Sequence, residues 1–142
     1  VIKAEEKDIS DIYQIGTVSF SDAWREETIR NDMKGGHSCY FIAKLAKKVI
    51  GYGCFWFIAD EAQLMNIGVL PEYRRMGAAE KILKQGLEEA AERHMEVIFL
   101  EVRVSNLPAQ SLYRKYNFQT VSVRQDVYEL PRENGYIMSR KV

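Results

Sequence analysis

Residues 64–83 read LMNIGVLPEYRRMGAAEKIL, and this segment decides the fold. Its residue types predict an apolar strand, a turn at Pro71, a basic loop and then a helix. The first N–H groups of a helix have no partner within the helix, and the helix dipole favours negative charge there. Gly77 would let a ligand approach the backbone, while Arg74 and Arg75 add positive charge. The segment therefore favours a phosphate site, and the alternative is an ordinary strand-to-helix connection with a solvated basic pair.

Composition narrows the class of protein. The 142 residues fit one domain, residues 1–142, and 20 Lys and Arg balance 20 Asp and Glu. A neutral chain argues against broad nucleic-acid binding. Cys39 and Cys54 lie in apolar runs without metal-ligand spacing, so we expect buried thiols and no metal site. No apolar run approaches the roughly 18 residues of a membrane span, and Val1–Glu6 does not resemble a signal peptide. We expect a soluble cytoplasmic protein with no membrane partner, as a monomer or weak dimer.

Hydrophobic periodicity gives the order of the elements. An amphipathic helix is expected over 77–93, between a strand over 63–69 and an apolar strand over 97–104. A strand, crossover helix and strand normally pair in parallel, so these two strands should be neighbours with the loop near their carboxyl ends. The other expected elements are strands over 1–4, 39–45, 49–58, 121–128 and 136–140, helices over 8–20, 26–33 and from 105 onward, and a turn-rich loop over 130–135. Together they predict one α+β domain with a mixed, mostly antiparallel sheet, flanked by helices, and a central parallel strand pair.

Two residues are candidates for chemistry. Alternation along 97–104 places Glu101 in an otherwise apolar strand, and burying a charge is unfavourable unless it is paired. Glu101 is either a base in a cleft or half of a structural ion pair with Arg103 or another arginine. Tyr113 lies on the inward face of the following helix, where the alternative is a core tyrosine. Trp24 lies in an aromatic corner between the first two helices, where core packing is the competing interpretation.

Two blocks and the loop carry a resemblance to a known family. Residues 66–74 read NIGVLPEYR, and residues 99–106 read FLEVRVSN, with Ala109, Leu112, Tyr113 and Phe118 following. Both blocks resemble the RimI type of GNAT-superfamily N-acetyltransferase, the ribosomal-protein-alanine N-acetyltransferases. A Walker loop requires Gly-Lys followed by Ser or Thr, and a dinucleotide fingerprint requires three glycines, so neither fits. The pattern Arg-x-x-Gly-x-Ala over 74–79 instead resembles the loop with which GNAT enzymes hold the pyrophosphate of acetyl-CoA.

The resemblance implies the GNAT (acyl-CoA N-acyltransferase) fold and a role for each matching residue. Glu101 would be the general base, Tyr113 the general acid at the sulfur, and the N–H of Val69 would lie near the thioester oxygen. Acetyl-CoA is the implied co-substrate, and neither a metal nor a covalent acyl-enzyme is required. The residues implied to bind acetyl-CoA are Ile67, Gly68, Val69, Arg74, Arg75, Met76, Gly77, Ala78, Ala79 and Asn106. Those implied to bind the acceptor are Trp24, Tyr128 and Glu133.

The sequence also departs from the family pattern. Ala79 replaces the commoner final glycine of the loop, which the pattern tolerates. Asn117 and His94 stand where helix-ending glycines are usual, so Asn117 must adopt a left-handed conformation before Phe118. Near the C-terminus only Tyr128 and Glu133 match the residues that the family uses to recognise its acceptor.

The implied reaction transfers acetyl from acetyl-CoA to the N-terminal α-amine of a protein, with the N-terminal alanine of a ribosomal protein as the expected acceptor. An α-amino group has a pKa of about 7.7–8.0, so at neutral pH a base must remove a proton before the amine can attack. Three alternatives stay open. These are that the acceptor is a small-molecule amine, that it is a lysine side chain, or that the protein binds acyl-CoA without turnover.

Overall fold

The computed structural model describes residues 1–142. Its strands are β1 (Ile2–Lys3), β2 (Ser38–Leu45), β3 (Lys48–Ile58), β4 (Glu61–Val69), β5 (Val97–Arg103), β6 (Gln119–Glu129) and β7 (Arg132–Lys141). Its α-helices are α1 (Ile9–Ser19), α2 (Glu26–Met33), α3 (Ala78–Glu92) and α4 (Leu107–Lys115). Two short 3-10 turns, η1 (Glu6–Asp8) and η2 (Pro71–Tyr73), lie before α1 and after β4.

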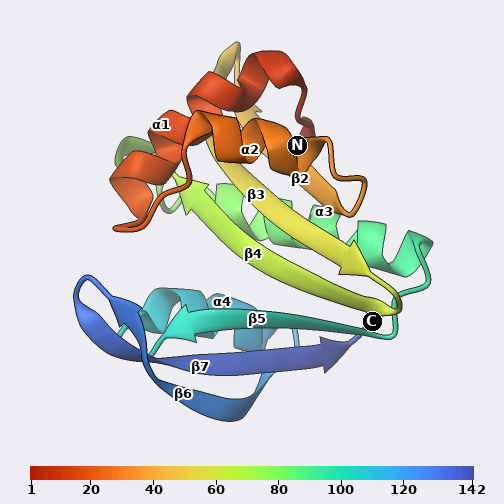
Figure 1. The fold of residues 1–142 in the computed structure, drawn as a ribbon, viewed down its shortest axis with the longest axis vertical. Coiled ribbons are helices and arrows are strands. Elements are labelled where there is room, and N and C mark those ends of the chain that lie inside the picture. Colours follow the sequence, from red (N-terminus) through yellow and green to blue (C-terminus); the bar gives the residue numbers. More distant parts are fainter.

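All the strands form one seven-stranded sheet in the order β1-β2-β3-β4-β5-β7-β6, and only β4 and β5 pair in parallel. The predicted α+β fold with a central parallel pair is therefore confirmed. Figure 1 shows α1 and α2 over one face of the sheet and α3 behind the other. Each helix turns its apolar stripe to the sheet, as in Ile12 of α1 and Ile82 of α3, both fully buried.

The parallel pairing is short, and this shapes the molecule. Pairing of β4 with β5 runs from Glu61 opposite Val97 to Leu64 opposite Leu100 and then stops. Beyond that point β4 continues along β3 and β5 continues along β7, so each strand keeps only one neighbour. An extra residue, Met65, interrupts the β3–β4 register at the same place, and such a bulge bends and twists a strand. The two strands consequently separate towards their carboxyl ends (Figure 1).

The C-terminal hairpin differs from the prediction. Strand β7 begins at Arg132, whereas the sequence predicted a turn-rich loop over 130–135, and β6 begins at Gln119. The connection is only Leu130 and Pro131, joined by a cis peptide bond. Residues 132–135 are polar or glycine and so show no apolar alternation, although Glu133 and Asn134 are half-buried and Gly135 is buried.

Several local features of the sequence can be located in the structure. Helix α1 begins at Ile9, one residue after its predicted start, and the Asp8 carboxylate accepts from the Glu5 N–H (2.8 Å) and so closes the turn before the helix. Asn117 takes the predicted left-handed conformation with φ of 69°, and His94 does the same with φ of 58°. Both cysteine thiols are free and buried, as predicted. No helix has the length and apolar character needed to cross a membrane.

Candidate active site

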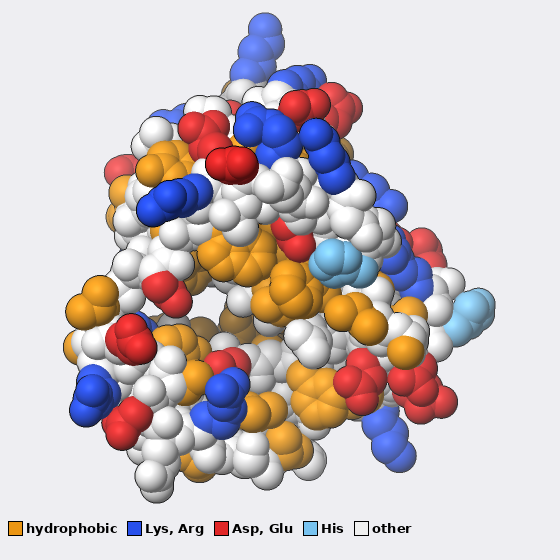
Figure 2. Space-filling model, in the orientation of Figure 1, with side chains coloured by type: hydrophobic (Ala, Val, Ile, Leu, Met, Phe, Trp, Pro, Cys, Tyr) orange, Lys and Arg blue, Asp and Glu red, His pale blue; other side chains and the backbone are white.

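A cleft of about 1430 Å³ lies where β4 and β5 separate. Figure 2 shows the surface hollowed between the half that carries α1, α2 and β4 and the half that carries β5 to β7. The α1–α2 connection, the start of α3, the inner side of α4 and part of β6 complete the walls. All site residues predicted from the sequence line this cleft except Met76 and Glu133. The structure therefore gathers residues that are far apart in the chain around one hollow.

The loop from η2 to α3 presents a row of free backbone donors. The N–H groups of residues 75–80 have no acceptor in the protein, because Gly77 at the N-cap carries no side chain that could cap the helix. Arg75 and Gly77 both adopt left-handed conformations, with φ of 69° and 81°. Such alternation of backbone conformation curves successive N–H groups into a concave site for an anion. Met76 contributes only its backbone there, since its side chain is exposed and outside the cleft.

Charged side chains flank this row of free backbone donors at one end of the cleft. Arg74 donates from Nε to the Val69 carbonyl oxygen (3.2 Å), which fixes the loop against the end of β4. Glu80 also faces the cleft, and Lys115 of α4 donates to its carboxylate (2.7 Å). This contact holds the pKa of Glu80 below its usual range. Lys115 therefore offsets the one negative side chain beside the row of free donors.

The end of β4 directs backbone groups into the cleft. The Leu70 N–H donates to the Ile50 carbonyl of β3 (2.8 Å), and backbone direction alternates along an antiparallel pair. Ile67 and Val69 must then point their N–H groups to the opposite side, where β5 no longer pairs. Gly68 lies between them, and a Cβ there would lie 3.1 Å from Ile15 of α1, so glycine allows α1 to pack closely on β4. The N–H of Val69 is consequently available to a ligand.

Glu101 is the first residue of β5 beyond its pairing with β4, and its side chain is half-buried in the cleft wall. Its Oε2 lies 3.3 Å from an Nη of Arg124 on β6. This contact reaches across β7 at Gly135, where a Cβ would lie 3.2 Å from Glu101 Cγ. Arg124 itself is mostly exposed, and exposed ion pairs contribute little stability. The arginine partner of the structural alternative is therefore present, and it comes from β6.

Tyr113 and Asn106 belong to the opposite wall. The Tyr113 ring packs edge-on against Phe118 (5.9 Å between centroids), and its hydroxyl makes no hydrogen bond with the protein. Burial raises the pKa of Tyr113 to about 12, so the phenol keeps its proton at neutral pH. Asn106 Oδ1 caps α4 by accepting from the Ala109 N–H (3.2 Å). The amide NH2 group of Asn106 makes no hydrogen bond with the protein and is free to bind a ligand.

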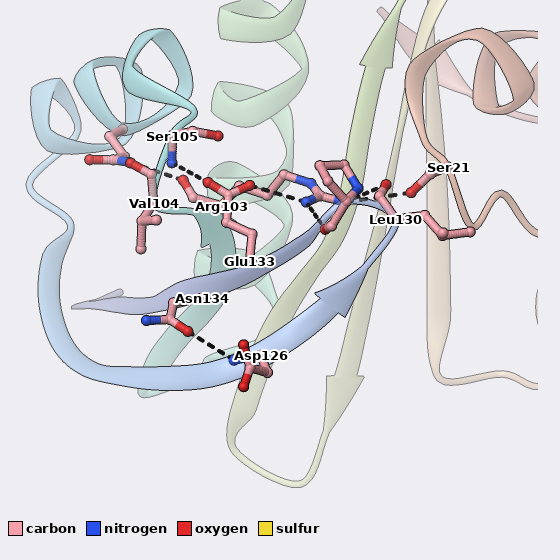
Figure 3. A network of polar contacts seen from close by, with 10 residues as sticks. Ser21, Arg103, Val104, Ser105, Asp126, Leu130, Glu133 and Asn134 are labelled. Atoms are coloured by element: carbon pink, nitrogen blue, oxygen red, sulfur yellow. Dashed lines mark hydrogen bonds and ion pairs between the residues drawn. The ribbon is translucent and has the colours of Figure 1, made fainter.

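Arg103 organises the other end of the cleft (Figure 3). Its guanidinium donates to the carbonyls of Pro131 (2.9 Å) and Leu130 (3.1 Å), and to Ser21 Oγ (3.4 Å) in the α1–α2 connection. It also lies 4.3 Å from the centroid of the Tyr128 ring. The hairpin tip and the α1–α2 connection are therefore joined across this end of the cleft.

Glu133 supports this arrangement from outside the cleft. Its two carboxylate oxygens accept from the Ser105 N–H (2.7 Å) and from Arg103 (3.1 Å), and these contacts hold the pKa of Glu133 low. Glu133 was predicted to bind the acceptor, and in the structure both of its oxygens hold the hairpin against Arg103 and Ser105. Trp24 does line the cleft, with its ring 6.2 Å from that of Trp56.

Sequence reasoning missed several residues that line the cleft. Arg124 lies in an exposed strand, and nothing in its neighbours marked it as a partner of Glu101. Ser19, Tyr52 and Asn66 contribute polar groups from three different elements. Asn66 stands in the first block of resemblance, which was the only available signal.

The comparisons with known proteins agree with this geometry. The acetyltransferase (GNAT) family profile matches residues 7–118. A Bacillus subtilis protein provisionally named a ribosomal protein bS18-alanine N-acetyltransferase is 32% identical, over 93% of this chain and 88% of the relative. An N-alpha-acetyltransferase of Saccharolobus solfataricus is 31% identical, over 96% and 89%. The crystal structure of the ribosomal-protein-S18-alanine N-acetyltransferase from Escherichia coli superposes with a TM-score of 0.90 at 28% identity, covering 99% of this chain and 91% of that one.

Proposed function

The chain belongs to the GNAT family as an acetyl-CoA-dependent N-acetyltransferase, and we propose that its acceptor is the N-terminal α-amine of a protein in the cytoplasm. The acceptor we favour is a ribosomal protein that begins with alanine, since relatives along nearly the whole chain carry that name. One observation carries the proposal. Glu101, Tyr113 and the free N–H of Val69, from three different elements, share one cleft with the loop over residues 74–79, which we call the phosphate loop.

The phosphate loop suits the pyrophosphate of acetyl-CoA, which supplies the acetyl group as a thioester. The free N–H groups of residues 75–80 offer donors to the phosphate oxygens at the positive end of the α3 dipole. Arg75 and Gly77 keep the curvature that this requires. Ile67 and Val69 then offer backbone groups to the arm that leads to the thioester.

Glu101 takes the proton from the acceptor amine. The ammonium form predominates at neutral pH, so it enters as a cation, and the exposed Arg124 gives way to it at the Glu101 carboxylate. Glu101 then accepts one proton, directly or through a water molecule, and the neutral amine attacks the acetyl carbon.

Val69 and Tyr113 assist the remaining steps. The N–H of Val69 donates to the negative charge that develops on the acetyl oxygen, and a fixed donor is effective because it needs no reorganisation. Tyr113 gives its phenolic proton to the departing sulfur, and the second proton that the nitrogen loses as the amide forms restores the phenol through solvent. A pKa of about 12 keeps this proton in place until the leaving group requires it.

The hydrogen bonds of Arg103 join the α1–α2 connection to the hairpin tip, and this join supports a chain end as the acceptor. The contacts of Arg103 with Ser21 and with the Leu130 carbonyl span the end of the cleft that faces away from the phosphate loop. We infer that this join favours an extended chain end over a lysine carried on a folded surface.

The proposal is tested with purified protein, acetyl-CoA and peptides that copy the N-termini of ribosomal proteins. Tandem mass spectrometry locates the acetyl group, and we expect it on the α-amine. Acetylation only on lysine side chains, or only on small amines, would contradict the proposed acceptor. Thermal stabilisation by acetyl-CoA with no thiol released against any peptide would instead indicate a binding protein.

A further inference from the structure

Two polar side chains in the cleft have atoms without a partner. Ser19 Oγ and Asn66 Oδ1 are shielded from solvent and make no hydrogen bond with the protein. Both residues line the cleft. Buried polar atoms are nearly always hydrogen-bonded, so an unpartnered one requires an explanation. A hydroxyl rotor and the soft terminal torsion of an asparagine can both turn toward a ligand without moving the backbone.

The two side chains flank the proposed reaction point. Asn66 and Gly68 lie two residues apart on β4 and so face the same side of the sheet. Ser19 Oγ lies 3.1 Å from where a Cβ of Gly68 would be, so the hydroxyl sits directly over Gly68. Val69, whose N–H we assign to the acetyl oxygen, follows immediately. The pair therefore adjoins the reacting atoms on the face covered by α1 and α2, away from the α3 loop.

We propose that Ser19 and Asn66 bind the first peptide group of the acceptor. The Ser19 hydroxyl donates to the carbonyl of the acceptor's first residue, and Asn66 Oδ1 accepts from the N–H of its second residue. The first peptide group of a chain begins within about 4 Å of its α-amine, so it falls at this position when the amine reaches the acetyl carbon. This inference rests on the proposed function and names the chemical feature by which the acceptor is selected.

The subsite separates α-amines from lysine side chains. A lysine ammonium is followed by four methylene groups, which can satisfy neither Ser19 nor Asn66. Each buried polar group left unpaired weakens the complex with the wrong acceptor by about tenfold. The selectivity thus comes from the wall of the cleft as well as from the join at Arg103.

The test compares three acceptors with Ser19→Ala and Asn66→Ala. The first is a hexapeptide that begins with alanine, and the second replaces its first peptide N–H by an ester oxygen. The third is blocked at its N-terminus and carries one lysine. We expect Asn66→Ala to lower kcat/KM about tenfold for the hexapeptide and hardly at all for the ester. Ser19→Ala should lower kcat/KM for both, and neither variant should lower the slow rate with the lysine peptide.

Matched controls separate recognition from folding. Ser10→Ala and Asn31→Ala change exposed residues of α1 and α2 and should leave every rate unchanged. Asn66→Asp retains an accepting oxygen and should keep the preference for the hexapeptide over the ester even if Asn66→Ala folds poorly.

Two results would overturn the assignment alone while the hexapeptide is still acetylated. One is an equal loss on hexapeptide and ester in Asn66→Ala, and the other is a raised KM for acetyl-CoA in either variant. If the wild-type protein acetylates no N-terminal peptide, this inference and the proposed function fail together.

Discussion

Replacing Tyr113 by phenylalanine removes one hydroxyl from the cleft and leaves the packing in place. The ring keeps its edge-on contact with Phe118, and the lost hydroxyl has no hydrogen-bond partner in the protein. We therefore expect the free energy of unfolding to change by less than about 1 kcal/mol. A general acid contributes roughly 10²–10⁴-fold to a rate, so kcat should fall by about that factor. The KM for acetyl-CoA should stay within about twofold, because the proton moves only when the sulfur departs.

The assay follows thiol release at saturating acetyl-CoA and peptide, with thermal melting of each variant alongside. Tyr136→Phe is the matched control, because Tyr136 packs against the same core but does not line the cleft. It should retain the full rate. Since the pKa of Tyr113 is about 12, loss of its proton should not limit the wild-type rate below about pH 11. A kcat for Tyr113→Phe within about threefold of wild type would remove Tyr113 from the mechanism.

Three further substitutions test other parts of the site and the fold. Glu101→Gln removes the proposed base and should lower kcat about 10²-fold or more, while acetyl-CoA still raises the melting temperature; an unchanged kcat would return Glu101 to a purely structural pair with Arg124. Gly77→Val forces a branched side chain into a left-handed conformation, with φ of 81°, and should destabilise the protein by at least about 1 kcal/mol and weaken acetyl-CoA binding in calorimetry. An affinity equal to that of wild type would argue against the phosphate loop. Gly86→Ala places a Cβ against the Phe55 ring and should lower stability by about 1–3 kcal/mol in denaturant titration, with no change in KM if the protein still folds.

The central part of the fold could be predicted because its sequence signals are local. Helix α3 was predicted over 77–93 and spans Ala78–Glu92, since its apolar stripe and the left-handed glycine before it both lie within one segment. The parallel pairing of β4 and β5 followed from the strand, helix and strand order. The alternation that set Glu101 apart from Leu100 and Val102 is confirmed by their burial.

The acceptor end of the site could not be predicted in the same way. Arg103 joins the α1–α2 connection to the tip of the β6–β7 hairpin, and no local pattern reports which carbonyl groups will meet a guanidinium. The contact between Glu101 and Arg124 depends on the β6–β7 register, which contains two irregularities. The hairpin itself was cut short in the prediction because residues 132–135 are polar or glycine and show no apolar alternation. Long-range register, and not residue type, decided each of these positions.

The cleft exists because β4 and β5 pair with each other over only part of their length. Inside a sheet, the N–H and C=O groups on both edges of a strand are normally satisfied by neighbours. Beyond Leu64 and Leu100 the facing edges of β4 and β5 no longer pair, but β4 remains paired with β3 and β5 remains paired with β7. A fixed edge with unpaired donors is thereby opened in the middle of the sheet, where its rigidity is greatest. The bulge at Met65 turns β4 away at the point where Glu101 begins the free part of β5, so the deviation that separates the strands also leaves Glu101 at the start of the cleft.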